Sequence, residues 1–170
     1  MEITLHLLQQ QDAAGLFQFE LENREFFERL VPSRGDDFYV FENFLSRHEE
    51  LLKEQQESFA NFYLIKNDSG DILGRINLVD IDRNNQTAEI GFRIGAKYGG
   101  KGIGNRALNL LLNADLGLKQ IHGKTTTVNG ASQKILTKNG FKEVDVSEEE
   151  FKMDGQNMRF VHYLWEAGKR

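Results

Sequence analysis

The sequence lacks cysteine altogether and contains a single proline, Pro32, in a loop-like segment at 31–37. Without thiols the chain has no disulfides, no thiolate metal ligands and no cysteine nucleophile. This is compatible with a reducing compartment. The four histidines, at positions 6, 48, 122 and 162, share no metal-ligand spacing, so we expect no metal site.

The sequence also has fewer positively than negatively charged residues. The 21 Lys and Arg residues face 26 Asp and Glu residues, for a formal net charge of -5 at pH 7. Nucleic-acid-binding proteins usually present a basic face, so we expect no nucleic-acid partner. The acidic balance instead mildly favours a cationic substrate through electrostatic steering.

Long apolar runs are missing as well. No segment reaches the length needed to span a bilayer, and the first residues lack a basic segment followed by an apolar one. We therefore expect no membrane partner, no signal peptide and a cytoplasmic location.

The 170 residues are enough for one domain with a sizeable core, and 39% of them are hydrophobic. No repeat, low-complexity tract or linker divides the chain, so we expect a single domain over 1–170. Alternation and helical spacing predict strands at 3–7, 61–66, 72–79, 86–94, 122–128, 141–146 and 158–165, and helices at 12–23, 41–57, 103–112 and 131–138. This order predicts a mixed α/β (α+β) fold rather than a regular alternation, with the last two strands antiparallel.

Glycine is concentrated between the predicted strand at 86–94 and the helix that follows it. The glycines of this turn are Gly99, Gly100, Gly102 and Gly104. Bare backbone N–H groups at the start of a helix can turn towards an anion. The segment therefore predicts a site for a phosphate-bearing cofactor, with a flexible turn that binds nothing as the alternative.

Two familiar phosphate motifs fit this turn poorly. Residues 95–102 nearly match a nucleoside-triphosphate loop, but Gly102 stands where that loop needs Ser or Thr to bind magnesium. The dinucleotide fingerprint fails too, because its third glycine would fall at Asn105.

A third motif fits better. Gly102-Ile103-Gly104 resembles the acetyl-CoA pyrophosphate loop of the GNAT N-acetyltransferase superfamily, Gln/Arg-x-x-Gly-x-Gly/Ala, although Gly99 stands at the Gln/Arg position. The segment from Asn129 to Phe141 resembles the same family's Asn-x-x-Ser segment that ends in Gly-Phe. With the early Asn-Arg-Glu-Phe at 23–26, the chain looks most like the ribosomal-protein N-terminal (serine/alanine) acetyltransferase branch. The resemblance covers most of the chain and is loose over its first third.

The resemblance implies a GNAT-type central, mostly antiparallel, twisted sheet of about seven strands flanked by about four helices. It also implies transfer of an acetyl group from acetyl-CoA, as co-substrate, to a primary amine. Because the chain has no cysteine, that transfer would be direct, within a ternary complex. A protein N-terminus, such as that of a ribosomal protein, is one acceptor; a small amine (polyamine or antibiotic) is another. A non-catalytic acyl-CoA-binding module remains an alternative, and both monomer and homodimer stay open.

The resemblance further implies where acetyl-CoA lies, in a cleft where the fourth and fifth strands splay apart. The backbone of Phe92, Arg93 and Ile94 would pair with the pantetheine arm, and Asn129 and Ser132 would orient its thioester end. The residues implied for the pyrophosphate are Gly99, Gly100, Lys101, Gly102, Ile103, Gly104 and Asn105.

Two residues are proposed to carry the proton transfers. Glu89, on the strand face opposite Ala88 and Ile90, is the proposed general base; the alternative is a solvated residue or a cross-strand salt-bridge partner. Many GNAT enzymes place an acid tyrosine seven residues after the motif asparagine, where this chain has Leu136. Ser132 is the nearest hydroxyl in the motif and the proposed acid; the alternative is that it only bonds backbone near the helix start.

Overall fold

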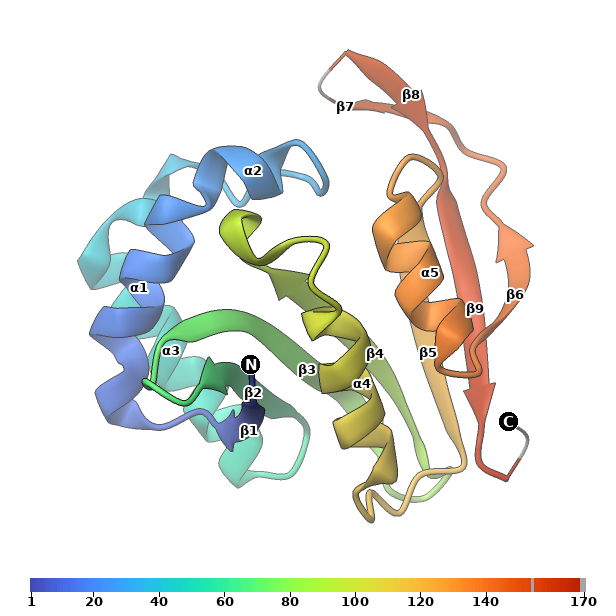
Figure 1. Ribbon diagram of the computed structural model, residues 1–170, viewed down its shortest axis with the longest axis horizontal. Helices are drawn as coiled ribbons and strands as arrows, with labels where there is room; N and C mark the ends of the chain where they lie inside the picture. The colour runs from blue at the N-terminus through green and yellow to red at the C-terminus, as the bar shows by residue number, and fades with distance from the viewer. Residues whose placement is uncertain (154, 169–170) are drawn as a thin grey trace.

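A seven-stranded sheet runs through the computed structural model, which describes residues 1–153 and 155–168 (Figure 1). In spatial order its strands are β1 (Ile3–Leu7), β2 (Asn61–Asn67), β3 (Ile72–Asp82), β4 (Thr87–Ile94), β5 (Gln120–Thr126), β9 (Phe160–Glu166) and β6 (Lys142–Val146). All neighbouring strands are antiparallel except β4 and β5, which are parallel. The predicted mixed fold, with a mostly antiparallel sheet, is confirmed.

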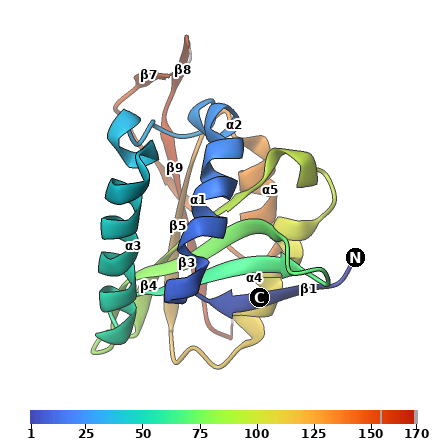
Figure 2. The ribbon, with the colours of Figure 1, turned by 90° about the vertical axis from the view of Figure 1, so that its left-hand side faces the viewer.

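Helices cover both faces of this sheet, as Figure 2 shows for α3 and α4. The first face carries α1 (Ala13–Glu22), α2 (Arg24–Glu28) and α3 (Phe41–Gln56); the second carries α4 (Ile103–Asn113) and α5 (Gly130–Lys138). Each layer has its own buried cluster, one centred on the α1–α3 layer and one on α4 and the sheet. Within the described residues, no helix is both long and apolar enough to cross a membrane.

Helix α4 forms where the apolar spacing predicted a helix. Its buried side chains are Ile103, Ala107, Leu108, Leu111 and Leu112, which return to one face every three or four residues. Gly102 stands at the N-cap with φ 74°, a left-handed conformation that disfavours side-chain-bearing residues. The glycine turn therefore ends in a helix N-terminus, as predicted.

Helix α2 and a short hairpin were not predicted. Helix α2 directly follows α1, and its five residues are too few to show a helical repeat in the sequence. The connection between β6 and β9 contains a small hairpin of β7 (Phe151–Met153) and β8 (Gln156–Met158), so the strand expected at 158–165 begins instead at Phe160. Figure 1 shows that α2 and this hairpin lie at the same end of the molecule.

The parallel strands β4 and β5 part before β4 ends. Their pairing runs from Thr87 with Gln120 to Ile90 with Gly123. Beyond that point, residues 91–94 pair with β3 alone among the described strands. The splay that the family resemblance implied is therefore present, and it starts directly after the last pair, Ile90 with Gly123.

Candidate active site

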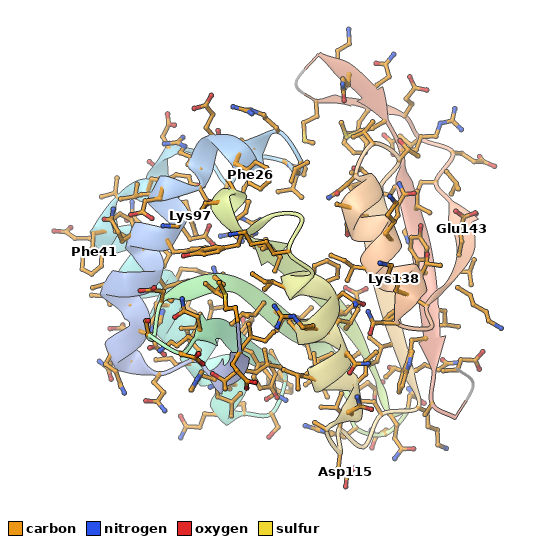
Figure 3. The ribbon with its side chains drawn as sticks, in the orientation of Figure 1. Phe26, Phe41, Lys97, Asp115, Lys138 and Glu143 are labelled. Atoms are coloured by element: carbon orange, nitrogen blue, oxygen red, sulfur yellow. The ribbon has the colours of Figure 1, made fainter. Side chains whose placement is uncertain are left out.

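The parted end of β4 borders a cleft of about 400 Å³. Its walls come from β4, from the turn after β4, and from α4, α5 and α2; Phe26 of α2 and Lys138 of α5 are labelled in Figure 3. The predicted cofactor-binding residues that line it are Phe92, Arg93, Ile94, Gly99, Gly100, Gly102, Ile103, Gly104, Asn105, Asn129 and Ser132. The segments 92–105 and 129–132, which are separate in the sequence, thus meet around one cavity.

The glycines of the turn serve different purposes. Gly100 and Gly102 adopt φ of 73° and 74°, and a Cβ built on either would meet nothing within 4 Å. Their need for glycine is therefore conformational, and the space in front of the first N–H groups of α4 stays open. Those N–H groups have no partner within the helix and carry its positive dipole end. The turn is shaped to receive an anion such as a pyrophosphate.

Gly104 has a packing role instead. A Cβ at this position would lie 2.6 Å from Cδ1 of Ile135 and 3.4 Å from Cγ1 of Ile94. The absence of a side chain lets α4 approach α5 and the end of β4 closely, and that approach sets the width of the cleft.

Helix α5 starts at the cleft. The Asn129 side chain accepts a hydrogen bond from the backbone N–H of Ser132 at 3.2 Å, which caps the helix. Lys134 and Lys138 also line the cleft, one turn apart. The sequence analysis did not assign them to the site, although their spacing of four residues places them on one face of the helix. Their ammonium groups make this wall favourable for phosphate.

The apolar end of the cleft was missed as well. Its lining residues there are Phe26, Phe27, Leu30 and Val31, from α2 and the residues after it. Asn23 fixes α2 at this place, because its Oδ1 accepts the backbone N–H of Ala96 at 2.8 Å. The early Asn-Arg-Glu-Phe segment was the available signal, since it contains both Asn23 and Phe26.

Lys101 is the one predicted cofactor-binding residue that does not line the cleft. Its side chain is exposed, and its Nζ lies 6.0 Å from the ring centroid of Tyr98, which is a lining residue. Lys101 thus stands outside the wall of the cleft.

Glu89 lies beside the parting of the strands and outside the cleft lining. Its side chain is 52% exposed, and its Oε1 is 3.5 Å from Nδ1 of His122, its register partner on β5. Ala88 and Ile90 are buried on the opposite face, as predicted. The geometry agrees with both interpretations of Glu89, a base beside the acceptor and a cross-strand ion pair.

Leu136 is 1% exposed, among core residues. This helix position therefore offers a leaving thiolate no hydroxyl. Within the described residues, no group of three or more His, Asp or Glu side chains is placed to hold a metal ion.

A buried ion cluster supports the cleft wall at Arg93. Glu20 of α1 is fully buried, and its carboxylate receives Arg75 at 2.8 Å, Arg34 at 3.1 Å and Arg93 at 3.5 Å. Burial raises the pKa of Glu20, but the three guanidinium groups outweigh it and hold that pKa below its usual value. Burial and repulsion from Arg34 lower the pKa of Arg93 to about 10.

Comparison with known proteins agrees with this geometry. Residues 2–142 match the family described as "Acetyltransferase (GNAT) domain". The Probable N-acetyltransferase YjcK of Bacillus subtilis (strain 168) is 29% identical over 151 residues, which cover 85% of this chain and 82% of that protein.

Solved structures share the fold. The ribosomal-protein-S5-alanine acetyltransferase from Vibrio fischeri superposes with a TM-score of 0.86 at 19% identity, over 100% of this chain and 96% of that one. The microcin C7 self immunity acetyltransferase MccE, in complex with acetyl-CoA and AMP, gives 0.85 at 26% identity, over 97% and 92%. A spermidine N-acetyltransferase from Vibrio cholerae, in complex with CoA and spermine, gives 0.80 at 19% identity, over 98% and 96%.

The family match spans most of the chain, and the cleft, the glycine turn and the cap of α5 lie where the resemblance implied. The chain belongs to the GNAT acetyltransferase family and is an acetyl-CoA-dependent N-acetyltransferase.

Proposed function

We propose that the acceptor is the α-amine of a protein N-terminus, and that the acetyl group passes to it directly. The observation that carries this proposal is the lack of carboxylates in the cleft. Its described lining includes no Asp or Glu, and its apolar end is formed by Phe26, Phe27, Leu30 and Val31. A polyamine with several positive charges needs several carboxylates to bind, whereas a peptide N-terminus brings a single ammonium group. The name of the S5-alanine relative from Vibrio fischeri points the same way.

Acetyl-CoA, when bound, supplies the acetyl group as an activated thioester. The unpaired edge of β4 at Phe92, Arg93 and Ile94 is the proposed partner of the pantetheine arm, because it offers backbone groups that no described strand uses on the β5 side. An N–H group near Phe92 would polarise the thioester carbonyl. Asn129 and Ser132 lie across the cleft and would orient the same end of the molecule.

The pyrophosphate is assigned to the start of α4. The proposed residues are Gly99, Gly100, Gly102, Ile103, Gly104 and Asn105, all of which line the cleft. Lys134 and Lys138 add charge from α5. Lys101 would contribute only a longer-range attraction, because it lies outside the lining.

Proton transfer is assigned to two residues. An amine attacks a carbonyl only in its neutral form, so an ammonium acceptor must first lose a proton. Glu89 is the proposed base because it lies one residue before the strands part and its carboxylate faces away from the core. Ser132 is the proposed proton donor to the departing thiolate, because its side chain lines the cleft and Leu136 has no hydroxyl.

The first experiment is a calorimetric titration with acetyl-CoA, with magnesium-ATP as the control. We expect binding of acetyl-CoA alone. Thiol release is then measured with peptides that begin with alanine or serine, with the same peptides blocked at the N-terminus, and with spermidine.

Each outcome separates the alternatives. If thiol is released with the free peptides and with no other amine, the proposal is supported. Release with spermidine only would make the chain a polyamine acetyltransferase. Binding of acetyl-CoA without release from any amine would favour the non-catalytic acyl-CoA-binding module.

A further inference from the structure

Four polar side chains stand in a connected row on the sheet face opposite α4 and α5. Oε1 of Glu89 lies 3.5 Å from Nδ1 of His122. Nε2 of His122 lies 3.3 Å from Nδ1 of His162, and Nε2 of His162 lies 2.8 Å from Oγ of Ser147. The first contact is at ion-pair distance and the other two are hydrogen bonds, so the row leads from β4 across β5 and β9 to the residue after β6.

Strand register creates the row. Glu89 is paired with His122 between the parallel strands, and His162 is paired with Lys124 between β5 and β9. His162 therefore lies diagonally across from His122, and the two rings meet edge to edge, with centroids 5.3 Å apart and planes 25° apart. Forty residues separate these histidines in the sequence, so only the folded sheet brings them together.

We propose that His122 and His162 form a relay that carries the proton of the acceptor amine away from Glu89 to Ser147 and water. This inference depends on the proposed function, in which Glu89 takes that proton. A relay is needed because of where Glu89 lies. An acceptor peptide seated over the parted strands would cover its carboxylate, whereas the row leads out beneath the acceptor towards β6.

The transfers balance at every step. The row starts with both imidazoles neutral and protonated on Nε2, so that each Nδ1 can accept. The ammonium nitrogen loses a proton to Glu89, and the neutral carboxyl O–H of Glu89 then donates that proton to Nδ1 of His122. His122 gives the proton on its Nε2 to Nδ1 of His162, and His162 gives the proton on its Nε2 through Ser147 to water. Each ring gains one proton and loses one, so both end neutral, with the proton now on Nδ1. Exchange with solvent restores the first tautomer, since the His122 side chain is 36% exposed.

Other charged side chains share this face. Lys124 of β5 and Asp145 of β6 are both register partners of His162, and Glu166 lies four residues further along β9. The ammonium group of Lys124 lies 4.5 Å from the ring centroid of Phe160, outside the row. Lys124 is thus a suitable control, because its replacement changes the charge on this face without interrupting the row.

The test compares His162→Phe with Lys124→Gln. Phenylalanine keeps a ring beside His122 and removes both nitrogens. We expect His162→Phe to lower kcat about tenfold with the KM for acetyl-CoA unchanged, and added imidazole to restore the rate. When kcat is measured in mixtures of light and heavy water, its dependence on the deuterium fraction should indicate that several protons move together in the wild type. The same measurement should indicate fewer moving protons in the variant. Lys124→Gln should match the wild type in every measurement.

A second measurement does not depend on turnover. Long-range proton–nitrogen NMR spectra report the tautomer of each imidazole, and we expect Glu89→Gln and His162→Phe each to change that of His122. An unchanged tautomer in both variants overturns the relay. A normal rate and proton count in His162→Phe, with an active wild type, also overturns it and leaves the proposed function intact. A wild type without activity on any amine overturns the proposed function instead.

Discussion

At the scale of single residues, two glycines of the phosphate turn, Gly102 and Gly104, are needed for different structural reasons. Position 102 requires glycine because its backbone is left-handed, and a Cβ built there would meet nothing within 4 Å. Gly104 is required by the closeness of Ile135. The sequence shows two glycines with one residue between them, and only the structure separates a conformational requirement from a packing requirement.

Gly102 is tested by a pair of substitutions. Alanine and glutamate both force a side chain into the left-handed region, which destabilises the fold by about 1–2 kcal/mol in each case. Only glutamate also places a carboxylate at the proposed pyrophosphate site. We expect Gly102→Glu to abolish acetyl-CoA binding in calorimetry and Gly102→Ala to weaken it far less. Unchanged affinity in folded Gly102→Glu would contradict the assignment of the turn.

Glu89 is tested by an isosteric change. Glu89→Gln removes the proposed base and keeps the shape, so we expect kcat to fall about a hundredfold or more. The acetyl-CoA affinity should stay the same, because Glu89 lies outside the cleft lining. Thiol release and calorimetry measure the two effects. Glu49→Gln, at an exposed position on α3, is the control; equal rates in both variants across pH would leave Glu89 a structural residue.

At the scale of elements, the sequence predicts best where a pattern repeats. The stripe from Ile103 to Leu112 predicted α4, and the alternation around Ile90 predicted β4, because each pattern recurs several times in one segment. Helix α2 was missed because one turn of helix has no repeat to detect. The apolar end of the cleft at Phe26 and Phe27 was missed with it.

Pairing between distant strands was the other part that the sequence did not reveal. In the sequence, His122 and His162 are isolated histidines whose spacing is not that of metal ligands. Their adjacency arises from the antiparallel register of β5 and β9, which depends on the packing of the whole sheet.

The contact between α4 and α5 is tested by a double-mutant cycle. Gly104→Ala should destabilise the fold by about 1 kcal/mol, because its Cβ would meet Cδ1 of Ile135 at 2.6 Å. Ile135→Val removes that methyl group and alone costs about 1 kcal/mol. In the double variant the clash is gone, so we expect the combined loss in urea unfolding to be smaller than the sum. Strict additivity would show that the two side chains do not meet.

At the scale of the whole molecule, Glu20 links parts of the chain that are far apart in sequence. Its carboxylate joins α1 to the loop at Arg34, to β3 through Arg75 and to β4 through Arg93. Arg93 also lines the cleft, so the helical layer on one face is tied to the strand end that borders the site. The buried carboxylate thus holds together three guanidinium groups that would repel one another without it.

This arrangement predicts how stability depends on pH. The folded state holds the pKa of Glu20 below its usual value near 4.5, so below about pH 4.5 the unfolded chain takes up a proton that the folded chain resists. The stabilisation from Glu20 is therefore complete near neutral pH and is lost as the pH falls through the lowered pKa. We expect Glu20→Gln to lose about 3–5 kcal/mol at pH 7, because three clustered guanidinium groups, with Arg75 buried among them, lose their counter-ion. Urea unfolding should show this difference from the wild type shrinking between pH 4.5 and pH 2, whereas a constant difference would mean that the carboxylate charge contributes nothing.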